Sequence, residues 1–359
     1  MKSNAAKKAI GVLKEWSIVL ALILVWAVLS FLSPHFLQWS NISNIFLQSS
    51  HIMMCAIGMT FILIGGQMDL SIGSVEALSG TICALTLVNL GLPFIPGVIL
   101  ACCAGVLCGL VSGLLVSRFK FPPFIATLSM QGIARGIALV ICKGAAILVT
   151  DQTFKDFGRY RLFDFLPIPV VVALVFLVLA HIVLTYTTFG TNVYALGSNE
   201  VAAQLSGINV KRTKLCVFMI SGFTAAIGGL IMSARLGSGQ STMGELDVMD
   251  TVASVVIGGT SMRGGVGKIR GTLVGVLIIL LVAYGPGREV HLDMADVVLN
   301  EFEILGSRGV GIQDVAEIMS LIERKKYAPI VQRYPLSEIN EVIDKLNSNK
   351  LIGRAVLVP

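Results

Sequence analysis

The sequence predicts an all-α polytopic membrane protein with about 8 to 10 transmembrane helices, some of them broken, followed by a short soluble α/β segment at the carboxyl end. Three observations support this fold class. The 359 residues are 55% hydrophobic and only 13% charged, whereas soluble domains are about 25% charged. Apolar runs recur through most of the chain. From residue 286 onward the composition changes, with 20 charged residues in the last 74 against 28 in the 285 before them.

The net charge of +6 does not indicate a nucleic-acid-binding protein, because no basic patch with interleaved aromatic residues is present in the sequence. Lys and Arg instead follow apolar runs, as expected when they orient membrane spans. We therefore expect membrane lipid, and no nucleic acid, around this chain. All seven cysteines lie between Cys55 and Cys216, in or beside apolar runs and without zinc-ligand spacing. We expect buried free thiols, and neither a metal nor a cofactor.

The apolar runs define the predicted spans. The first run ends at Pro34 without a cleavage site, so we expect a retained span after a cytoplasmic leader at residues 1–15. Residues 41–48 predict a short amphipathic surface helix. Residues 252–259 are too short to span about 30 Å of hydrocarbon, and we expect them to continue a broken helix from residues 245–250. The predicted spans are 17–32, 52–64, 74–90, 95–116, 122–142, 169–185, 215–233 and 271–285.

A glycine-rich stretch, GGQMDLSIGS at residues 65–74, separates two of these spans. Irregular backbone at membrane depth must line a cavity or be covered by protein. Asp69 costs a few kcal/mol there unless it is paired or faces water, so it either lies near a polar path or caps the helix that begins near Ser71. Arg135, inside span 122–142, needs a carboxylate or an aqueous cavity, and Asp69 is a candidate partner. The helix-breaking glycines of the stretch are Gly65, Gly66 and Gly73.

Small residues recur at every fourth position of the span 95–116. Such a stripe permits close contact between helices in a membrane. We interpret it as a packing feature without chemistry. Its members are Ala101, Gly105, Gly109 and Gly113.

Residues 189–214 form a polar interruption of about two dozen residues between spans, and three positive charges near its end predict a cytoplasmic location. Within it, residues 200–205 predict a short helix with the small residues Ala202 and Ala203 on one side, and Gly207 as its stop. Small side chains allow another surface to approach closely, so the segment is either a docking element or an ordinary solvated loop. The three charges are Lys211, Arg212 and Lys214.

Residues 264–268, GGVGK, superficially resemble a phosphate-binding loop. The P-loop pattern requires Ser or Thr after the lysine, and Ile269 stands there instead. We expect a cytoplasmic turn at this position. Since the chain has no other such pattern, we expect it not to hydrolyse ATP, and any energy for transport must come from a partner subunit.

Four stretches together resemble the ribose-type sugar permeases, the membrane subunits of ATP-binding-cassette importers for pentoses, hexoses and related polyols. In chain order they are GGQMDLSIGS, FPPFIATLSMQGIARG, YALGSNEVAAQLSGINVKRTK and IGGTSMRGGVGKIRGTLVG. The resemblance covers about residues 16–279 and implies a multi-pass protein of the bacterial inner (plasma) membrane.

The resemblance also implies partners and site residues. It implies a separate ABC ATPase, an extracytoplasmic (periplasmic) sugar-binding protein docking near residues 143–167, and a second permease copy in a homodimer or heterodimer. The alternative for residues 143–167 is an ordinary mixed-charge loop. The resemblance does not indicate which sugar is carried. The implied ATPase-coupling residues are Gly197, Asn199, Glu200, Ala202, Ala203 and Gly207, and the implied translocation-path residues are Gly65, Gly66, Asp69, Ser71, Gly73 and Arg135.

The carboxyl end resembles a different family, the medium-chain, zinc-type alcohol or polyol dehydrogenases, most clearly in PLSEINEVIDKLNSNKLIGRAV. We therefore divide the chain into a permease domain at residues 1–279 and an incomplete dehydrogenase-like fragment at residues 280–359. Strands are predicted at 302–305 and 355–358, and surface helices at 315–322 and 339–346. The alternative function, a membrane-linked sugar-alcohol dehydrogenase, is disfavoured because the zinc ligands and cofactor turn of that family are missing. We expect no catalytic residue and no enzyme activity.

Overall fold

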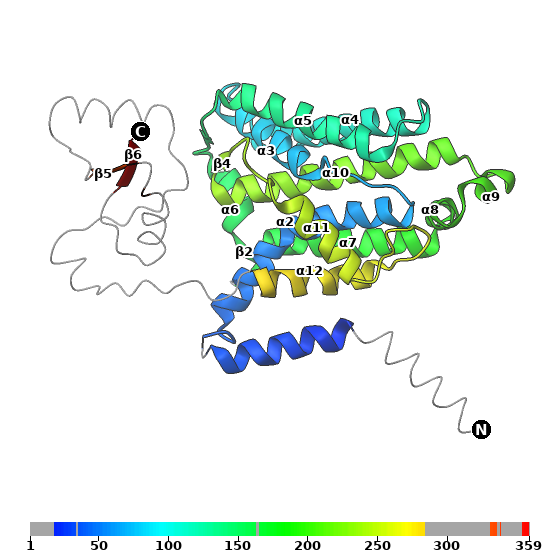
Figure 1. Ribbon diagram of the computed structural model, residues 1–359, viewed down its shortest axis with the longest axis horizontal. Helices are drawn as coiled ribbons and strands as arrows, with labels where there is room; N and C mark the ends of the chain where they lie inside the picture. The colour runs from blue at the N-terminus through cyan, green and yellow to red at the C-terminus, as the bar shows by residue number, and fades with distance from the viewer. Residues whose placement is uncertain are drawn as a thin grey trace. The chain divides into compact units, whose positions relative to one another are not determined.

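The computed structural model describes residues 18–33, 35–162, 165–283, 331–335, 338 and 354–358. The chain divides into two compact units, Met1–His291 and Leu292–Pro359. Most described residues of the first unit lie in α-helices (Figure 1).

The described part of the first unit has five helices that are long and apolar enough to cross a membrane: α2 (Trp39–Ile64), α4 (Phe94–Ser117), α5 (Pro123–Cys142), α7 (Ile168–Tyr186) and α10 (Val210–Leu236). Three further apolar helices there are shorter: Ile18–Leu32, α3 (Ile72–Val88) and α12 (Ile269–Ala283). This composition is that of a polytopic membrane protein.

Local sequence signals position several helix ends. Proline residues begin α5, where the missing N–H has no intrahelical partner to lose. Gly237 ends α10 in the left-handed conformation, with φ of 68°. Asn209 caps the start of α10, because its side chain accepts a hydrogen bond from the Arg212 N–H.

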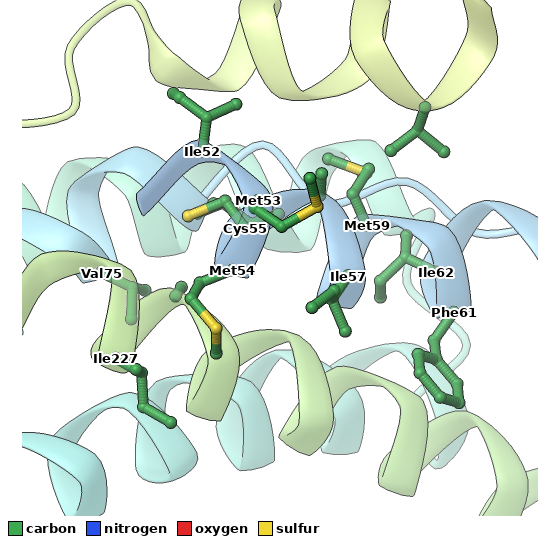
Figure 2. Packing of buried hydrophobic residues seen from close by; sticks show 14 of the residues in the cluster. Ile52, Met53, Met54, Cys55, Ile57, Met59, Phe61, Ile62, Val75 and Ile227 are labelled. Carbon is green, nitrogen blue, oxygen red and sulfur yellow. The ribbon is translucent and has the colours of Figure 1, made fainter. Parts of the chain in front are cut away.

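Helix α2 lies at the centre of the unit and packs against α10, α7, α12 and α11 (Asp247–Ile257). All its residues from Ser49 to Ile64 are buried, as expected of a helix that is apolar all round. Figure 2 shows the side chain of Ile52 pointing to one side of α2 and those of Met54 and Phe61 pointing to the opposite side.

The stripe of small residues predicted for α4 faces α10, and the packing prediction is confirmed. A Cβ added at Gly109 would lie 3.0 Å from the Met219 Cα, and one at Gly113 would lie 3.1 Å from the Phe218 Cβ. These distances leave no room for a larger side chain. All four members of the stripe are buried: Ala101, Gly105, Gly109 and Gly113.

Two predicted boundaries are wrong. The surface helix at 41–48 and the span at 52–64 form one continuous helix, α2. The polar residues between them do not interrupt it, because Ser49 and Ser50 donate hydrogen bonds of 2.8 and 2.6 Å to backbone carbonyls within the same helix. The predicted loop 189–214 is also largely helical, since α8 (Thr188–Ser198) and the start of α10 occupy most of it.

The chain between α5 and α7 contains folded elements. Strand β1 (Ile147–Leu148) pairs antiparallel with β4 (Ser238–Gly239), and β2 (Arg161–Leu162) pairs with β3 (Leu166–Pro167). Helix α6 (Gln152–Arg159) lies between β1 and β2 in the chain. It is capped by Asp151, and its Phe154 side chain is completely buried. These elements lie at one end of the bundle, which we call the α6 end (Figure 1).

In the second unit the described residues include two strands, β5 (Val331–Pro335) and β6 (Arg354–Val358). They pair in parallel, with Val331 opposite Arg354. Strand β6 confirms the strand predicted at 355–358. The strand predicted at 302–305, the helices predicted at 315–322 and 339–346, and the leader at 1–15 lie outside the described residues.

Candidate functional site

The stretch between α2 and α3 is not helical. Gly65 follows the last residue of α2, and Gly66 has φ of 68°, which a side-chain-bearing residue rarely adopts. Helix α3 begins at Ile72. The predicted break in the helical structure is therefore confirmed. Most of the stretch is buried or half-buried, whereas Gly66 is exposed.

Asp69, 2% exposed, joins this stretch to α10. One carboxylate oxygen accepts hydrogen bonds from the Ser71 N–H and hydroxyl at 2.9 and 2.6 Å, and the other accepts one from the Ser221 hydroxyl at 2.7 Å. The carboxylate thus orders the chain immediately before α3 and also connects two helices. The two interpretations of Asp69 as cap or as path residue remain compatible with this geometry.

Arg135 does not pair with Asp69, so the candidate ion pair is wrong. Its guanidinium donates to the backbone carbonyls of Ser241 and Met243, in the turn that precedes α11. The physical reason is that the oxygens of Asp69 are already bonded by serine residues of α10 and its own stretch. Arg135 instead connects α5 to the turn at residues 241–246.

The short helix predicted at residues 200–205 is present as α9 (Glu200–Leu205). The Asn199 side chain caps it by accepting a hydrogen bond of 3.0 Å from the Ala202 N–H. Gly207 follows with φ of 83°, the conformation expected at a helix stop. Glu200 forms an ion pair of 2.8 Å with Lys214 of α10. Figure 1 shows α9 projecting at the end of the bundle away from α6, which we call the α9 end.

The α9 side chains that face outward differ from those predicted from the sequence. Ala203 is buried against Leu196 and Val210, so it packs α9 onto its own chain and does not face outward. The outward apolar side chains are Val201 and Leu205, which are 68% and 85% exposed. They lie four residues apart and therefore on one face of the helix.

Three connections meet beneath α9. A Cβ on Gly197 would overlap the Ile64 carbonyl at the end of α2, and one on Gly264 would lie 2.9 Å from the Gly66 Cα. The Gly265 N–H donates to the Ile64 carbonyl at 2.8 Å. The end of α8, the end of α2 and the turn before α12 therefore share one contact made almost entirely of backbone.

Gly264 and Gly265 are members of this site that are not predicted from the sequence, where residues 264–268 indicate only a turn that is not a phosphate-binding loop. The signal that could have identified them is the paired glycine itself, since both residues have positive φ, of 84° and 72°.

A cavity of about 430 Å³ lies between the end of helix Ile18–Leu32, the start of α2 and the end of α12, and a larger one of about 820 Å³ lies at the α9 end. The larger cavity is lined by Gly66 and Gln67 of the α2–α3 stretch and by Glu200 and Gln204 of α9. It therefore connects the two sets of residues that the sequence analysis singled out.

All seven cysteines are free, as predicted, but they are not all buried, because Cys103 on α4 is exposed. Among the described residues, no group of three or more His, Cys, Asp and Glu side chains could hold a metal ion.

Comparisons with known proteins agree on one family. A family model described as "Branched-chain amino acid transport system / permease component" matches residues 41–297, a range that continues past the predicted boundary at residue 279. The ribose import permease protein RbsC of Bacillus subtilis is 40% identical over 320 residues, covering 89% of this chain and 95% of that protein. RbsC of Haemophilus influenzae is 39% identical over 284 residues, covering 78% and 87%. The L-arabinose transport system permease protein AraH of Escherichia coli is 36% identical over 281 residues, covering 77% and 85%. No solved structure matches the chain.

Proposed function

This chain belongs to the family of branched-chain amino acid transport system permease components, and from this premise we propose how its geometry serves sugar import. It is the permease component of an ATP-binding-cassette importer for ribose-like sugars. It is a non-enzymatic, multi-pass transmembrane subunit. The proposal concerns the residues that receive the ATPase and those that shape the path.

The exposed face of α9 is the proposed ATPase contact. Val201 and Leu205 present two large apolar side chains to solvent on a helix that projects beyond the spans, and exposed apolar patches mark protein contacts. The positive residues Lys211 and Arg212 next to it support a cytoplasmic location. The coupling set is Gly197, Asn199, Glu200, Val201, Leu205 and Gly207, with Ala202 beside them and Ala203 as the internal packing residue.

The contact beneath α9 supports a route for the coupled movement. A displacement of α9 is transmitted through Gly197 to the Ile64 carbonyl, because these backbones are in direct contact. Ile64 precedes Gly65 and Gly66, whose backbone leads to Asp69, Ser71 and α3. We therefore place the gate of the translocation path in this stretch, next to the cavity of about 820 Å³. Gly73 and Arg135 belong to the same proposed path.

The proposed ATPase contact is supported above all by the exposure of the Leu205 side chain. A charged residue at this position tests the proposal. Leu205→Arg is expected to abolish co-purification with the ATPase, because an arginine cannot enter an apolar contact without losing hydration. Leu148→Arg, at a residue of β1 that is 70% exposed at the α6 end, is the matched control. Ala203→Arg is less suitable, because it would unpack α9 itself. If the Leu205 variant still binds the ATPase, the assignment is wrong.

The remaining proposed partners are a second permease copy, identical or different, and an extracytoplasmic sugar-binding protein that docks on the α6 end. This end carries the exposed side chains Leu148 and Tyr160. Native mass spectrometry of the purified importer should show two permease copies with the ATPase. Leu148→Arg should weaken capture of the binding protein while leaving the ATPase bound.

We further propose that the dehydrogenase-like fragment, predicted at residues 280–359, is the part of the chain that follows the family match, after residue 297. The parallel pairing of β5 and β6 supports an α/β origin, because parallel strands are typical of that class. A cysteine at Ser337, in a background without the native cysteines, would report its side of the membrane to an impermeant thiol reagent. We expect labelling from outside, together with sensitivity to protease and no binding of zinc or nicotinamide cofactor. A protected cytoplasmic fragment in a fully active importer would instead indicate a regulatory domain.

A further inference from the structure

Glu76 is a fully buried acid inside the helical bundle. It lies on α3 and is 0% exposed. Both of its carboxyl oxygens are buried without a conventional hydrogen-bond donor among the described residues, and the weakly donating Cys55 thiol lies beside them. A Cβ on Gly228 of α10 would lie 2.7 Å from Glu76 Oε1, and one on Gly244 would lie 2.7 Å from Oε2. Glycines on two segments therefore make room for this carboxyl group.

The nearest acidic group is Asp247, the first residue of α11, whose side chain is within hydrogen-bonding reach of Glu76. Asp247 also lies beside His51 of α2, with 3.4 Å between the Asp247 Oδ2 and the His51 Nε2. The other ring nitrogen, Nδ1, lies 3.3 Å from an Arg235 nitrogen that can only donate. Nδ1 is therefore the acceptor, which leaves the ring hydrogen on Nε2, the nitrogen that lies 3.4 Å from the Asp247 Oδ2.

Charged and titratable groups surround the pair from several elements. His51 and Cys55 face it from α2, Arg135 from α5, and Arg235 reaches it through His51 from α10. Glu245 and Asp250, on the turn and on α11, add negative charge near Arg135 and Asp247. From α10, the surface that touches Glu76 directly is Gly228 and Gly229, which have no side chain to donate or titrate.

These surroundings favour opposite states for the two acids. Asp247 has His51 beside it, and this neighbour favours the ionised carboxylate. A second ionised carboxylate in contact with it, buried and with only the weakly donating Cys55 thiol beside it, would carry both the repulsion of like charges and the cost of dehydration. If Glu76 carries a proton, both costs disappear, because its O–H then donates to Asp247. A carboxylic acid and a carboxylate form a strong, charge-assisted hydrogen bond.

We propose that Glu76 and Asp247 bind one proton between them, and that this shared proton fastens α11 to α3. Helix α11 has 11 residues, too few to span the membrane. Its last residue is Ile257, and Gly258 caps its end. Its described contact with α3 is small compared with its contacts with α12 and α2. The proposed hydrogen bond at its first residue adds to the close packing of Gly73 of α3 against Gly244, in the turn before α11. When α11 moves away, Glu76 meets water, releases the proton and cannot re-form the bond until it is protonated again.

Infrared spectroscopy of the purified full-length protein in lipid nanodiscs tests the shared proton directly. The wild-type protein at neutral pH should show the carbonyl band of a protonated carboxylic acid. Glu76→Gln should remove the band, because glutamine keeps the shape and the donor but has no acid proton. Glu245→Gln, at an exposed carboxylate on the neighbouring turn, is the matched control and should retain it. The proposal is overturned if the wild type lacks the band or if the Glu76→Gln variant keeps it.

Amide hydrogen exchange tests the fastening of α11. After division by the intrinsic rate, opening of residues 247–257 in the wild type should rise by about tenfold per pH unit as one proton is released per opening. In Glu76→Gln the corrected rate should not depend on pH. A pH-dependent rate in that variant would contradict the proposal. If Glu76→Gln does not fold, Glu76→Asp replaces it in the infrared test, where an acid band unshifted from wild type would assign the proton to another group.

Discussion

The Ser221 hydroxyl donates a hydrogen bond of 2.7 Å to the Asp69 carboxylate, between residues 152 positions apart in the chain. Ser221 lies in the first half of α10, the helix against which α2, α3 and α4 all pack. The bond therefore attaches the irregular stretch between α2 and α3 to the most extensively packed helix of the unit. Since the same carboxylate also binds Ser71, the stretch has a defined position relative to both helices.

Removing the Ser221 hydroxyl should destabilise the protein. Ser221→Ala takes one charge-assisted hydrogen bond from a buried carboxylate, which typically costs about 1.5 to 3 kcal/mol. Thermal unfolding of the purified protein measures the effect. Ser129→Ala is the control, because that hydroxyl is exposed and bonds only within α5. An equal loss of thermal stability in both variants would show that the bond between Ser221 and Asp69 stabilises the protein no more than an exposed hydroxyl does.

Neutralising Asp69 should affect transport more than folding. Asp69→Asn keeps the size of the side chain but replaces one acceptor oxygen with a donor, so the bonds to Ser71 and Ser221 cannot both persist unchanged. We expect lower sugar uptake with little loss of protein from the membrane. Uptake by proteoliposomes and the amount of membrane-inserted protein are measured together. Loss of folded protein without a separate transport defect would favour a purely capping role.

A methyl group at Gly109 should separate α4 from α10. A Cβ there would lie 3.0 Å from the Met219 Cα, and overpacking of this kind typically costs about 1 to 3 kcal/mol. Gly132→Ala on α5 is the matched control, because a Cβ at that position meets nothing within 4 Å. Thermal unfolding should therefore show a loss of stability for Gly109→Ala and little change for Gly132→Ala. Equal behaviour of the two variants would contradict the close packing of α4 on α10.

A methyl group at Gly197 should uncouple the ATPase from transport. The added Cβ would overlap the Ile64 carbonyl, so α8 and the end of α2 must move apart, whereas the exposed face of α9 is unchanged. We expect Gly197→Ala to bind the ATPase normally and to hydrolyse ATP with less sugar carried per ATP. The ratio of uptake to hydrolysis in proteoliposomes is the measurement. A wild-type ratio would show that coupling does not depend on this contact.

Tyr194 should make the protein less stable at alkaline pH. Its hydroxyl donates a hydrogen bond of 2.8 Å to the Gly267 carbonyl, and burial raises its pKa above the ordinary value, partly offset by Lys268. A raised pKa means that the neutral phenol stabilises the fold below the unfolded pKa of about 10, and that this stabilisation is lost as the pH rises through the folded pKa. Tyr194→Phe should cost about 1 kcal/mol near pH 7 and should abolish that alkaline decline.

The control for Tyr194 is Tyr186→Phe, at a side chain that is 74% exposed. We expect this variant to match the wild type in both respects when thermal unfolding is followed from neutral to alkaline pH. An alkaline decline that persists in Tyr194→Phe would assign it to another group.

Features set by neighbours in the chain could be predicted from the sequence. The apolar runs, the glycine break at Gly65 and Gly66, the stripe on α4 and the helix Glu200–Leu205 depend on hydropathy and on local conformational preference. The continuous helix α2 was missed, because Ser49 and Ser50 look like interruptions until their hydroxyls are seen to bond within the helix itself.

The sequence alone determined the class of this protein, the order of its membrane helices and the two segments in which we propose that its coupling and path residues lie. Only the tertiary structure decided which side chains meet. It paired Asp69 with Ser221 rather than with Arg135, buried Ala203 while exposing Leu205, and brought Gly197, Ile64 and Gly265 together. The physical reason is that hydropathy acts on whole helices and is the same for many rotations and pairings of them. A hydrogen bond or a glycine contact depends on the one pairing that the packed bundle adopts.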